Sequence, residues 1–294
     1  MRFGFVASAG TPEQAGALAA SAEGHGWDGI FTWDGIAIGE MEIYDPWVVL
    51  AVIATRTERI RLGAMVTPPT RRRPWKLARE TMSIDRLSGG RLIVPVGLGA
   101  LDDGAFGNVG EPTDARTRAE LLDESLAVVT GLGTGRPFAF EGSHFRFGPM
   151  TFRPPPVQSP RPPIWVAASW PFERSVRRAA RWDGMVVQVN DPATGFRRPT
   201  ATDVAVIAES IGQERARLEL DGPFDIVVEG RTTPGVGAGD EPAALAAAGA
   251  TWWIEADWEG ATVASLHRRL EAGPPGPAQE SATEAIGSLQ GRAR

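Results

Sequence analysis

The sequence predicts a closed (β/α)₈ barrel, a TIM barrel, with an inserted hairpin and a proline-rich segment between its fourth and fifth strand–helix units. Short apolar runs alternate with longer helical patterns eight times along the 294 residues. Such alternation implies a parallel sheet, and eight repeats close that sheet into a barrel. A doubly wound sheet would need a G-x-G-x-x-G fingerprint after its first strand, and residues 7–12, ASAGTP, lack one.

The first four strand–helix units follow one another directly. Thr11 and Asp45 are expected to cap the first two helices, because each is a good N-cap residue with proline after it. The strands are predicted at residues 2–7, 29–33, 61–67 and 91–98. The helices are predicted at residues 12–24, 46–57, 75–87 and about 113–132.

The alternation is interrupted at about residues 135–163. Residues 138–152 alternate aromatic and polar side chains around a Glu-Gly-Ser turn, which predicts a hairpin. Residues 153–163 contain six prolines and predict an extended link. The later strands are predicted at 164–168, 184–189, 225–229 and 251–255, and the helices at 172–181, 204–220, 242–248 and 261–270. We expect residues 1–272 to form one domain, with a polar tail at 273–294.

The composition excludes several classes of function. The chain has no cysteine, which excludes disulfides and thiolate catalysis. Its net charge of −6 argues against a nucleic-acid partner. No run approaches the roughly 18 apolar residues of a membrane span, and the N-terminus begins as a strand. We therefore expect a cytoplasmic protein that binds a small molecule. The basic run of Arg71, Arg72 and Arg73 indicates either a solvated loop or an anion contact.

The predicted strand ends contain few groups for acid–base chemistry. Barrels carry their sites at the C-terminal ends of the strands, and these ends are rich in small and aromatic residues. The three histidines, His25, His144 and His267, lie elsewhere, and no metal-ligand spacing or G-x-S-x-G occurs, so we expect no metal. A site poor in catalytic side chains is typical of an enzyme whose cofactor supplies the chemistry.

Several segments, taken in order, resemble the luciferase-like oxidoreductases, the bacterial luciferase superfamily of FMN- and F420-dependent barrels. The resemblance covers about residues 1–270, and the insertion falls where this family carries one. It is carried by GWDGIFTWD at 26–34, RLGAMVTP at 61–68, SIDRLSGGRL at 83–92, VGLG at 96–99 and RPPIWV at 161–166.

The resemblance implies where a flavin or deazaflavin would lie. It implies a non-proline cis peptide between Ala64 and Met65, against one face of the ring. It implies that Asp34, next to Trp33, lines the ring pocket. Further implied contacts are Thr67 at the ring edge, Gly97 and Gly99 in a close-packed loop, and Ala167, Ala168 and Ser169 toward the side chain and its phosphate. A helix expected just after Ser169 would favour that phosphate through its dipole.

The chain departs from the resemblance at one position. F420-dependent members commonly have Asp-His at the end of the second strand, whereas here Gly35 follows Asp34. Either another group moves the proton, or this member has different or no redox chemistry. The candidates within reach are Asp34, Glu40, Glu42, Tyr44 and Asp102, of which Asp34 and Asp102 are the predicted catalytic residues.

The leading hypothesis is hydride transfer between F420 and a small organic substrate. The alternatives are an FMN-dependent two-component monooxygenase served by a flavin reductase, and a flavin-binding barrel with lost or altered redox activity. A sugar-processing barrel using Glu229 and Glu255 is weaker, because both also suit a structural role at strand ends. Substrate contacts are predicted at Gly35, Tyr44, Trp170 and Trp258. A homodimer through the second and third helices is expected; the alternative is that the hairpin covers the apolar second helix.

Overall fold

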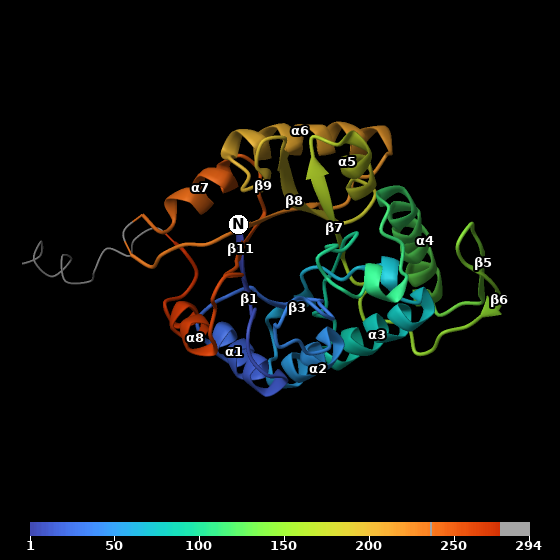
Figure 1. The fold of residues 1–294 in the computed structure, drawn as a ribbon, viewed down its shortest axis with the longest axis horizontal. Helices are drawn as coiled ribbons and strands as arrows, with labels where there is room; N and C mark the ends of the chain where they lie inside the picture. Colours follow the sequence, from blue (N-terminus) through green and yellow to red (C-terminus); the bar gives the residue numbers. More distant parts are fainter. Residues whose placement is uncertain (236, 277–294) are drawn as a thin grey trace, which may run out of the picture.

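The computed structural model describes residues 1–235 and 237–276. Eight parallel strands form the barrel, and helices surround them (Figure 1). The strands are β1 (Arg2–Val6), β2 (Gly29–Thr32), β3 (Arg61–Ala64), β4 (Val94–Val96), β7 (Ile164–Trp170), β8 (Gly184–Asp191), β10 (Asp225–Gly230) and β11 (Trp252–Glu255). Their order is β3-β2-β1-β11-β10-β8-β7-β4.

The barrel closes between β3 and β4 through two isolated parallel bridges. These bridges join Leu62 to Leu92 and Thr67 to Val96. The backbone N–H of Ile93 donates to the Leu62 carbonyl at 2.8 Å, and the N–H of Thr67 donates to the Pro95 carbonyl at 2.9 Å. The predicted (β/α)₈ barrel is therefore confirmed.

The helices begin where the sequence places good capping residues. The Thr11 hydroxyl accepts a hydrogen bond from the Gln14 N–H, and the Asp45 carboxylate accepts from Trp47 and Val48. The helices are α1 (Pro12–Gly24), α2 (Pro46–Arg56), α3 (Pro74–Leu87), α4 (Ala115–Gly133), α5 (Glu173–Ala179), α6 (Ala201–Arg217), α7 (Asp240–Ala247) and α8 (Val263–Glu271), with short 3₁₀ turns η1 (Pro69–Arg71) and η2 (Gly107–Val109).

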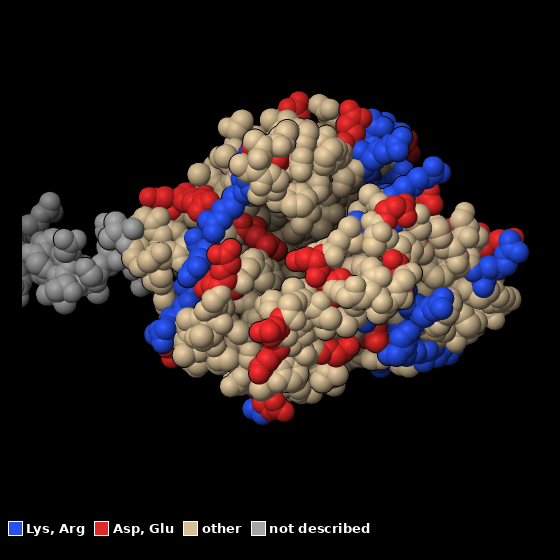
Figure 2. All heavy atoms as spheres, in the orientation of Figure 1, with Lys and Arg blue, Asp and Glu red and all other residues tan. Residues whose placement is uncertain are grey.

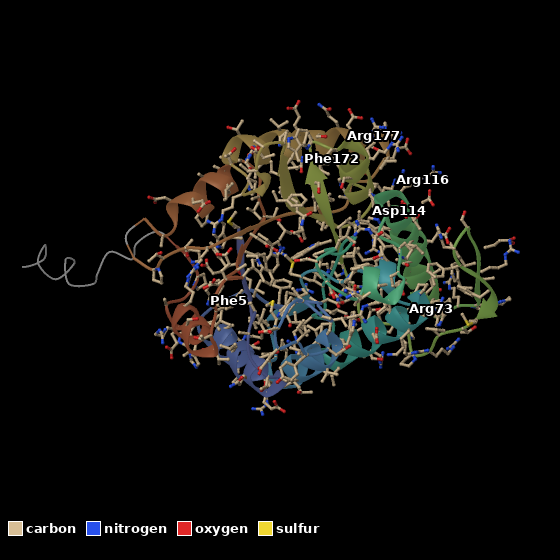
Figure 3. The ribbon with its side chains drawn as sticks, viewed as in Figure 1. Phe5, Arg73, Asp114, Arg116, Phe172 and Arg177 are labelled. Atoms are coloured by element: carbon tan, nitrogen blue, oxygen red, sulfur yellow. The ribbon has the colours of Figure 1, made fainter. Side chains whose placement is uncertain are left out.

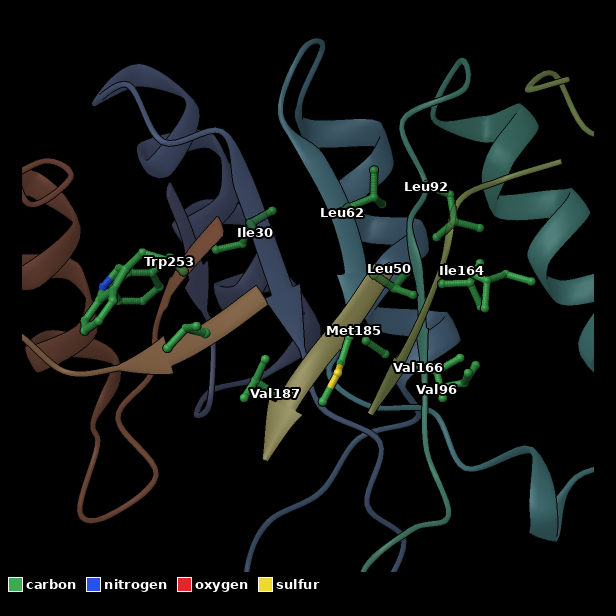
Figure 4. Close-up of a cluster of buried hydrophobic side chains, with 14 of the residues drawn as sticks. Ile30, Leu50, Leu62, Leu92, Val96, Ile164, Val166, Met185, Val187 and Trp253 are labelled. Atoms are coloured by element: carbon green, nitrogen blue, oxygen red, sulfur yellow. The ribbon is translucent and has the colours of Figure 1, made fainter. Parts of the chain in front are cut away.

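The alternation of side chains along each strand divides the core into two layers. The larger layer lies between the strands and the helices, and Figure 4 shows part of it around Ile30, Leu62 and Val187. The smaller layer fills the inside of the barrel and includes Phe31, Trp165, Val186, Val227, Trp252 and Ile254. A residue's place in its strand therefore decides whether its side chain faces the helices or the barrel interior.

The predicted insertion forms a hairpin beside α4. Strands β5 (Phe138–Glu141) and β6 (Arg146–Met150) pair antiparallel, and the hairpin projects from the side of the barrel (Figure 1). Its aromatic side chains pack on Ala78 of α3 and on Val128 and Leu132 of α4. The proline-rich link that follows is held to α3, because the N–H groups of Val157 and Gln158 both donate to the Asp85 carboxylate.

Four predicted strands differ from the observed ones by two or more residues at an end. The strand predicted at 61–67 ends at Ala64, and the strand predicted at 164–168 continues to Trp170. The strand predicted at 91–98 is regular only at β4, and before it Leu92 forms just an isolated bridge to Leu62. The buried guanidinium of Arg91 hydrogen-bonds the carbonyls of Ala54, Thr57 and Ile60. The strand predicted at 184–189 continues to Asp191, where an unpredicted strand, β9 (Gly195–Arg197), pairs antiparallel with it.

The C-terminal part of the chain is described only up to residue 276. Residues 277–294, which make up most of the predicted tail, lie outside the described residues, as does residue 236. Within the described ranges, no helix has the length and apolar character needed to cross a membrane.

Candidate functional site

A cavity of about 410 Å³ opens at the C-terminal ends of the strands. Its floor is formed by the top of the inner core layer, where Met65, Val66 and Val186 are exposed to it. Figure 2 shows a hollow in the middle of the viewed face, with acidic side chains at its edge. The other lining residues are Trp33, Asp34, Ile38, Met41, Pro68, Arg71, Gly99, Ala100, Asp102, Asp103, Gln188, Glu229 and Trp258.

The cavity brings together many of the residues predicted for the site. Six of them line it, namely Trp33, Asp34, Met65, Gly99, Asp102 and Trp258. Gly35 and Tyr44 are not among its lining residues, and neither is Trp170, which packs against the outer core layer. The apolar walls are therefore provided by fewer aromatic residues than the sequence suggested.

Asp34 belongs to a buried network of ion pairs. Its side chain is fully buried, and Nη2 of Arg72 lies 2.8 Å from each of its carboxylate oxygens. Nη2 of Arg71 donates to the Asp34 carbonyl at 2.8 Å and lies 3.3 Å from the carboxylate. Arg71 is 2% exposed, so the solvated-loop interpretation of this basic run is wrong for that residue. The arrangement gives Asp34 a bracing role, because both of its oxygens already accept charge-assisted hydrogen bonds.

Asp103 is the other carboxylate of this network, and the sequence analysis missed it in favour of Asp102. Its oxygens accept hydrogen bonds from the N–H groups of Ile36, Ala37 and Ala105 and from Arg71. Burial by itself raises the pKa of Asp103, but these four donors outweigh it and lower the pKa to about 2. Asp103 thereby joins the loop after β2 to the loop after β4, whereas Asp102 is exposed at the cavity rim.

The non-proline cis peptide lies between Met65 and Val66, one residue later than predicted. Ala64 is still part of β3, paired with Thr32, and its side chain packs in the outer core layer. Met65 and Val66 follow the last residue of the strand, and both side chains face the cavity. At this place the cavity is therefore lined by Val66, whereas Ala64 is part of the outer core layer.

Two glycines after β4 allow this loop to pack closely against the cavity wall. A Cβ atom on Gly97 would lie 2.9 Å from Val66 and 3.2 Å from Ala167. Gly99 has a φ of +86°, and a Cβ there would lie 2.9 Å from Pro68. Gly97 is therefore beside the cavity and Gly99 is in its wall. The side chain of Thr67, predicted at the ring edge, is almost fully buried where β3 meets β4.

A second cavity, of about 850 Å³, lies between the start of α4 and the start of α5. It is lined by Ser169 together with three arginines: Arg116, Arg174 and Arg178. In Figure 3, Phe172 marks the α5 side of this cavity and Arg116 marks the α4 side. The neighbouring Ala168 is buried in the outer core layer, so only its backbone is available to a ligand.

The arginines of the second cavity differ in how they are paired. Arg116 pairs with Glu120 at 2.9 Å, and Arg178 pairs with Asp123 at 2.6 Å. Arg174 is exposed and forms no ion pair with any residue in the described ranges. This cavity therefore presents positive charge that its own carboxylates only partly balance.

The two cavities meet at the end of β7 and β8. The Ser169 hydroxyl, in the second cavity, donates to the side-chain oxygen of Gln188, in the first, at 3.4 Å. Leu98 of the second cavity also adjoins Gly99 of the first. A ligand with a flat ring and a long anionic chain fits this arrangement, with the ring over the apolar floor and the chain beside the arginines.

Glu229 and Glu255 do not form a two-carboxylate site. Glu255 accepts hydrogen bonds from Thr232, Trp253 and Arg269, which confirms its structural role. Glu229 instead faces the first cavity, where it accepts one hydrogen bond from Trp258 Nε1 at 3.4 Å. Burial raises the pKa of the Glu229 carboxyl, and the hydrogen bond from Trp258 offsets this only in part.

The profile of the luciferase-like monooxygenase family matches residues 1–221. The chain belongs to this family. It is 30% identical over 230 residues to an F420-dependent glucose-6-phosphate dehydrogenase of Nakamurella multipartita, an alignment that covers 75% of this chain and 64% of that relative. The chain therefore spans less than two thirds of that relative's length.

The same barrel is found in solved structures with little sequence identity. The coenzyme F420-dependent tetrahydromethanopterin reductase of Methanopyrus kandleri superposes with a TM-score of 0.73 at 16% identity, covering 92% of this chain and 96% of that one. A monooxygenase of Streptomyces bottropensis gives a TM-score of 0.73 at 22% identity, covering 92% and 98%. At these identities the likeness establishes the fold.

Proposed function

We propose that this protein is an F420-dependent oxidoreductase that transfers a hydride between the deazaflavin and a small organic substrate. The observation that carries the proposal is the pair of adjoining cavities, one with an apolar floor for a ring and one with arginines for an anionic chain. The dependence of the Nakamurella relative and the Methanopyrus reductase on F420 supports this choice of cofactor.

The residues of the chain have separate tasks in this proposal. Met65 and Val66 support one face of the ring, and Trp33 encloses it from the side. Ser169 and Arg174 bind the anionic chain. When bound, the deazaflavin would supply the hydride chemistry, and the protein would fix its position and exclude water.

The network of Asp34, Arg71 and Asp103 has a supporting task. It fixes the loops after β2 and β4 at the cavity wall without leaving an unpaired buried charge. Residues that hold a site in place in this way affect the affinity for the ring through its geometry rather than through direct chemistry.

FMN is the alternative cofactor, because its single phosphate also suits the second cavity. In that case the protein would act as a monooxygenase with a flavin reductase as partner. F420 is favoured because its chain carries carboxylates in addition to phosphate, and the cavity presents Arg174 beside two arginines that are themselves paired with carboxylates. A barrel with altered redox activity, suggested by Gly35, would bind the same ring without turning it over.

Anaerobic titration with F420 and FMN, offered separately, tests the proposal. We expect F420 to bind more tightly, and Arg174→Gln to weaken F420 binding about tenfold, because a charge-assisted hydrogen bond contributes about 1.5–3 kcal/mol. Arg146→Gln, on the exposed hairpin strand, is the matched control and should bind F420 as the wild type does. Preferential binding of FMN, with rapid oxygen consumption by the reduced complex, would favour the monooxygenase. Binding of neither cofactor would refute both the F420-dependent and the FMN-dependent function.

A further inference from the structure

We propose that Glu229 is the proton-transferring residue of the cavity, acting in place of the histidine that is absent at position 35. The inference rests on the proposed hydride transfer, because it concerns the proton that accompanies that hydride. The inference takes the substrate to be a carbonyl compound or the corresponding alcohol, in which the oxygen gains or loses a proton as the carbon gains or loses a hydride.

The position of Glu229 in β10 directs its side chain into the barrel. Ile226 and Val228 pack in the outer layer, whereas Val227 packs in the inner layer. Two residues after Val227, Glu229 therefore faces the same interior, one step closer to the open end. Its register partner on β11 is Ile254, another member of the inner layer. A carboxyl group thus stands at the edge of an otherwise apolar floor.

The immediate surroundings of Glu229 favour its neutral form. These neighbours carry no charge that would stabilise a carboxylate: the indole of Trp258 donates its one hydrogen bond, and the cavity-lining residues on β8 are Val186 and Gln188. Burial raises the pKa of the carboxyl, which brings protonation closer to neutral pH. A general acid or base works best when its pKa lies near the working pH.

The other buried charged groups that face the cavity are already held in ion pairs. Asp34 and Asp103 lie across the cavity from β10, and both are paired with the buried Arg71. The low pKa of Asp103 makes it a poor proton donor. Asp102 is exposed at the rim. Beside β10, Arg231 and Asp257 pair with each other at 3.1 Å.

The proposed step balances protons and electrons. In the reducing direction, a reduced deazaflavin bound in the cavity would supply a hydride to the substrate carbonyl carbon, and the carbonyl π electrons would move to oxygen. That oxygen takes the proton of the Glu229 carboxyl, which gives the alcohol and leaves a carboxylate. Water at the open mouth returns the proton to Glu229. In the oxidising direction, the Glu229 carboxylate takes the alcohol proton, and the oxidised deazaflavin, when bound, would accept the hydride that leaves carbon.

The protonation state of Glu229 can be measured without any substrate. Protein labelled with ¹³C at the glutamate side-chain carboxyl is titrated by NMR, and the resonance absent from Glu229→Gln is assigned to Glu229. We expect this resonance to titrate at higher pH than the exposed glutamates and to shift when F420 is added. Trp258→Phe should move its titration further upward, because the indole hydrogen bond stabilises the carboxylate. Glu241→Gln, on the exposed face of α7, is the matched control.

The kinetic test uses reduced F420 with a panel of short-chain ketones and aldehydes. We expect Glu229→Gln to lower kcat by about 10²–10⁴-fold, the usual contribution of general acid catalysis, with a smaller change in KM. In the wild type, the reduction rate should fall as pH rises through the pKa of Glu229, because the proton donor is lost. This fall in rate with rising pH should be absent from Glu229→Gln.

The outcomes separate this inference from the proposed function. A protein that binds neither F420 nor FMN contradicts the proposed function. A protein that binds F420, but whose Glu229 titrates with the exposed glutamates or does not respond to F420, contradicts only the proton-transfer role. Unchanged kcat in Glu229→Gln also overturns it. If no compound of the panel is reduced, the NMR titration still tests the raised pKa and the response to F420 that the role requires, and failure of either overturns the inference.

Discussion

Gly35 shows how the absence of one side chain shapes the cavity. A Cβ atom at this position would overlap the ring of Trp33 and lie 3.2 Å from Ile38. The space that a histidine would need is therefore occupied by Trp33, which is itself part of the cavity wall. The departure from the family pattern is accompanied by a repacked wall rather than by an empty space.

Restoring the histidine should consequently damage the site. We expect Gly35→His to displace the Trp33 ring and to weaken F420 binding by about tenfold or more, a loss of about 1.4 kcal/mol. The measurement is a fluorescence titration with F420 of the variant and the wild type. Gly107→Ala is the control, because a Cβ at Gly107 would meet its nearest atom only at 4.0 Å. Equal or tighter binding by Gly35→His would contradict this account of the wall.

The sequence could predict single residues only where the local pattern decides their role. The caps Thr11 and Asp45 were predictable, because an N-cap contacts residues two or three positions away. The bonding of Asp34 and Asp103 was not, because their arginine partner lies over 30 positions from each along the chain. The resemblance placed the cis peptide within one residue, but the exact bond depends on where β3 ends.

At the scale of elements, Asp103 connects two loops that the sequence gives no reason to join. It receives N–H groups from the loop after β2 and from its own loop after β4, and both loops line the cavity. Because its pKa in the folded protein is about 2, against an ordinary value of 3.8, its ionised form stabilises the fold.

The pH dependence of unfolding tests this connection. Since the pKa of Asp103 is lowered in the folded state, its contribution is fully present above pH 3.8 and is lost as pH falls toward 2. The difference between the folded and ordinary pKa values corresponds to about 2 kcal/mol in the free energy of unfolding. We expect Asp103→Asn to be less stable than the wild type at neutral pH. Its free energy of unfolding, measured with urea, should fall less steeply as the pH is lowered toward 2. Asp102→Asn, on the exposed rim, is the control. A slope as steep in Asp103→Asn as in the wild type would contradict the assignment.

The sequence predicted the elements better than their ends. Hydrophobic periodicity identifies strands and helices by a local pattern, and all eight barrel strands were found in this way. The extension of β8 and the pairing of β9 depend on contacts outside the barrel wall, which leave no periodic signal. The buried hydrogen bonds of Arg91, just before β4, likewise go to residues 54–60, which lie over 30 positions earlier in the sequence.

At the scale of the whole molecule, closure of the barrel gives the two cavities fixed positions relative to each other. The end of β4 lies beside both cavities, through Leu98 and Gly99, and β4 takes its place in the wall by its bridges to β3. The sequence predicted the cavity positions because every parallel strand ends on the same side of the barrel. It could not predict which side chains meet there, since this depends on loops with no regular pattern.

The outer surface of α2 is the place where we expect a partner subunit to bind. The hairpin packs on α3 and α4, so it does not cover α2 as the alternative interpretation supposed. Most apolar residues of α2 are buried within the chain, but Val48 is 55% exposed. The exposed side chain of Tyr44 lies in the loop just before it. Exposed apolar side chains on this surface support the homodimer proposed through α2 and α3.

We therefore expect Val48→Asp to weaken a homodimer formed through α2 and α3, because a carboxylate placed in an apolar interface loses hydration without gaining a partner. Sedimentation equilibrium should give a dimer dissociation constant about 100-fold higher, or roughly 2.7 kcal/mol, for the variant than for the wild type. Val206→Asp, at an exposed position of α6 on another part of the surface, serves as control because it carries the same charge change. A wild-type protein that sediments as a monomer would exclude the homodimer. A Val48→Asp variant that dimerises as strongly as the control would place the interface elsewhere.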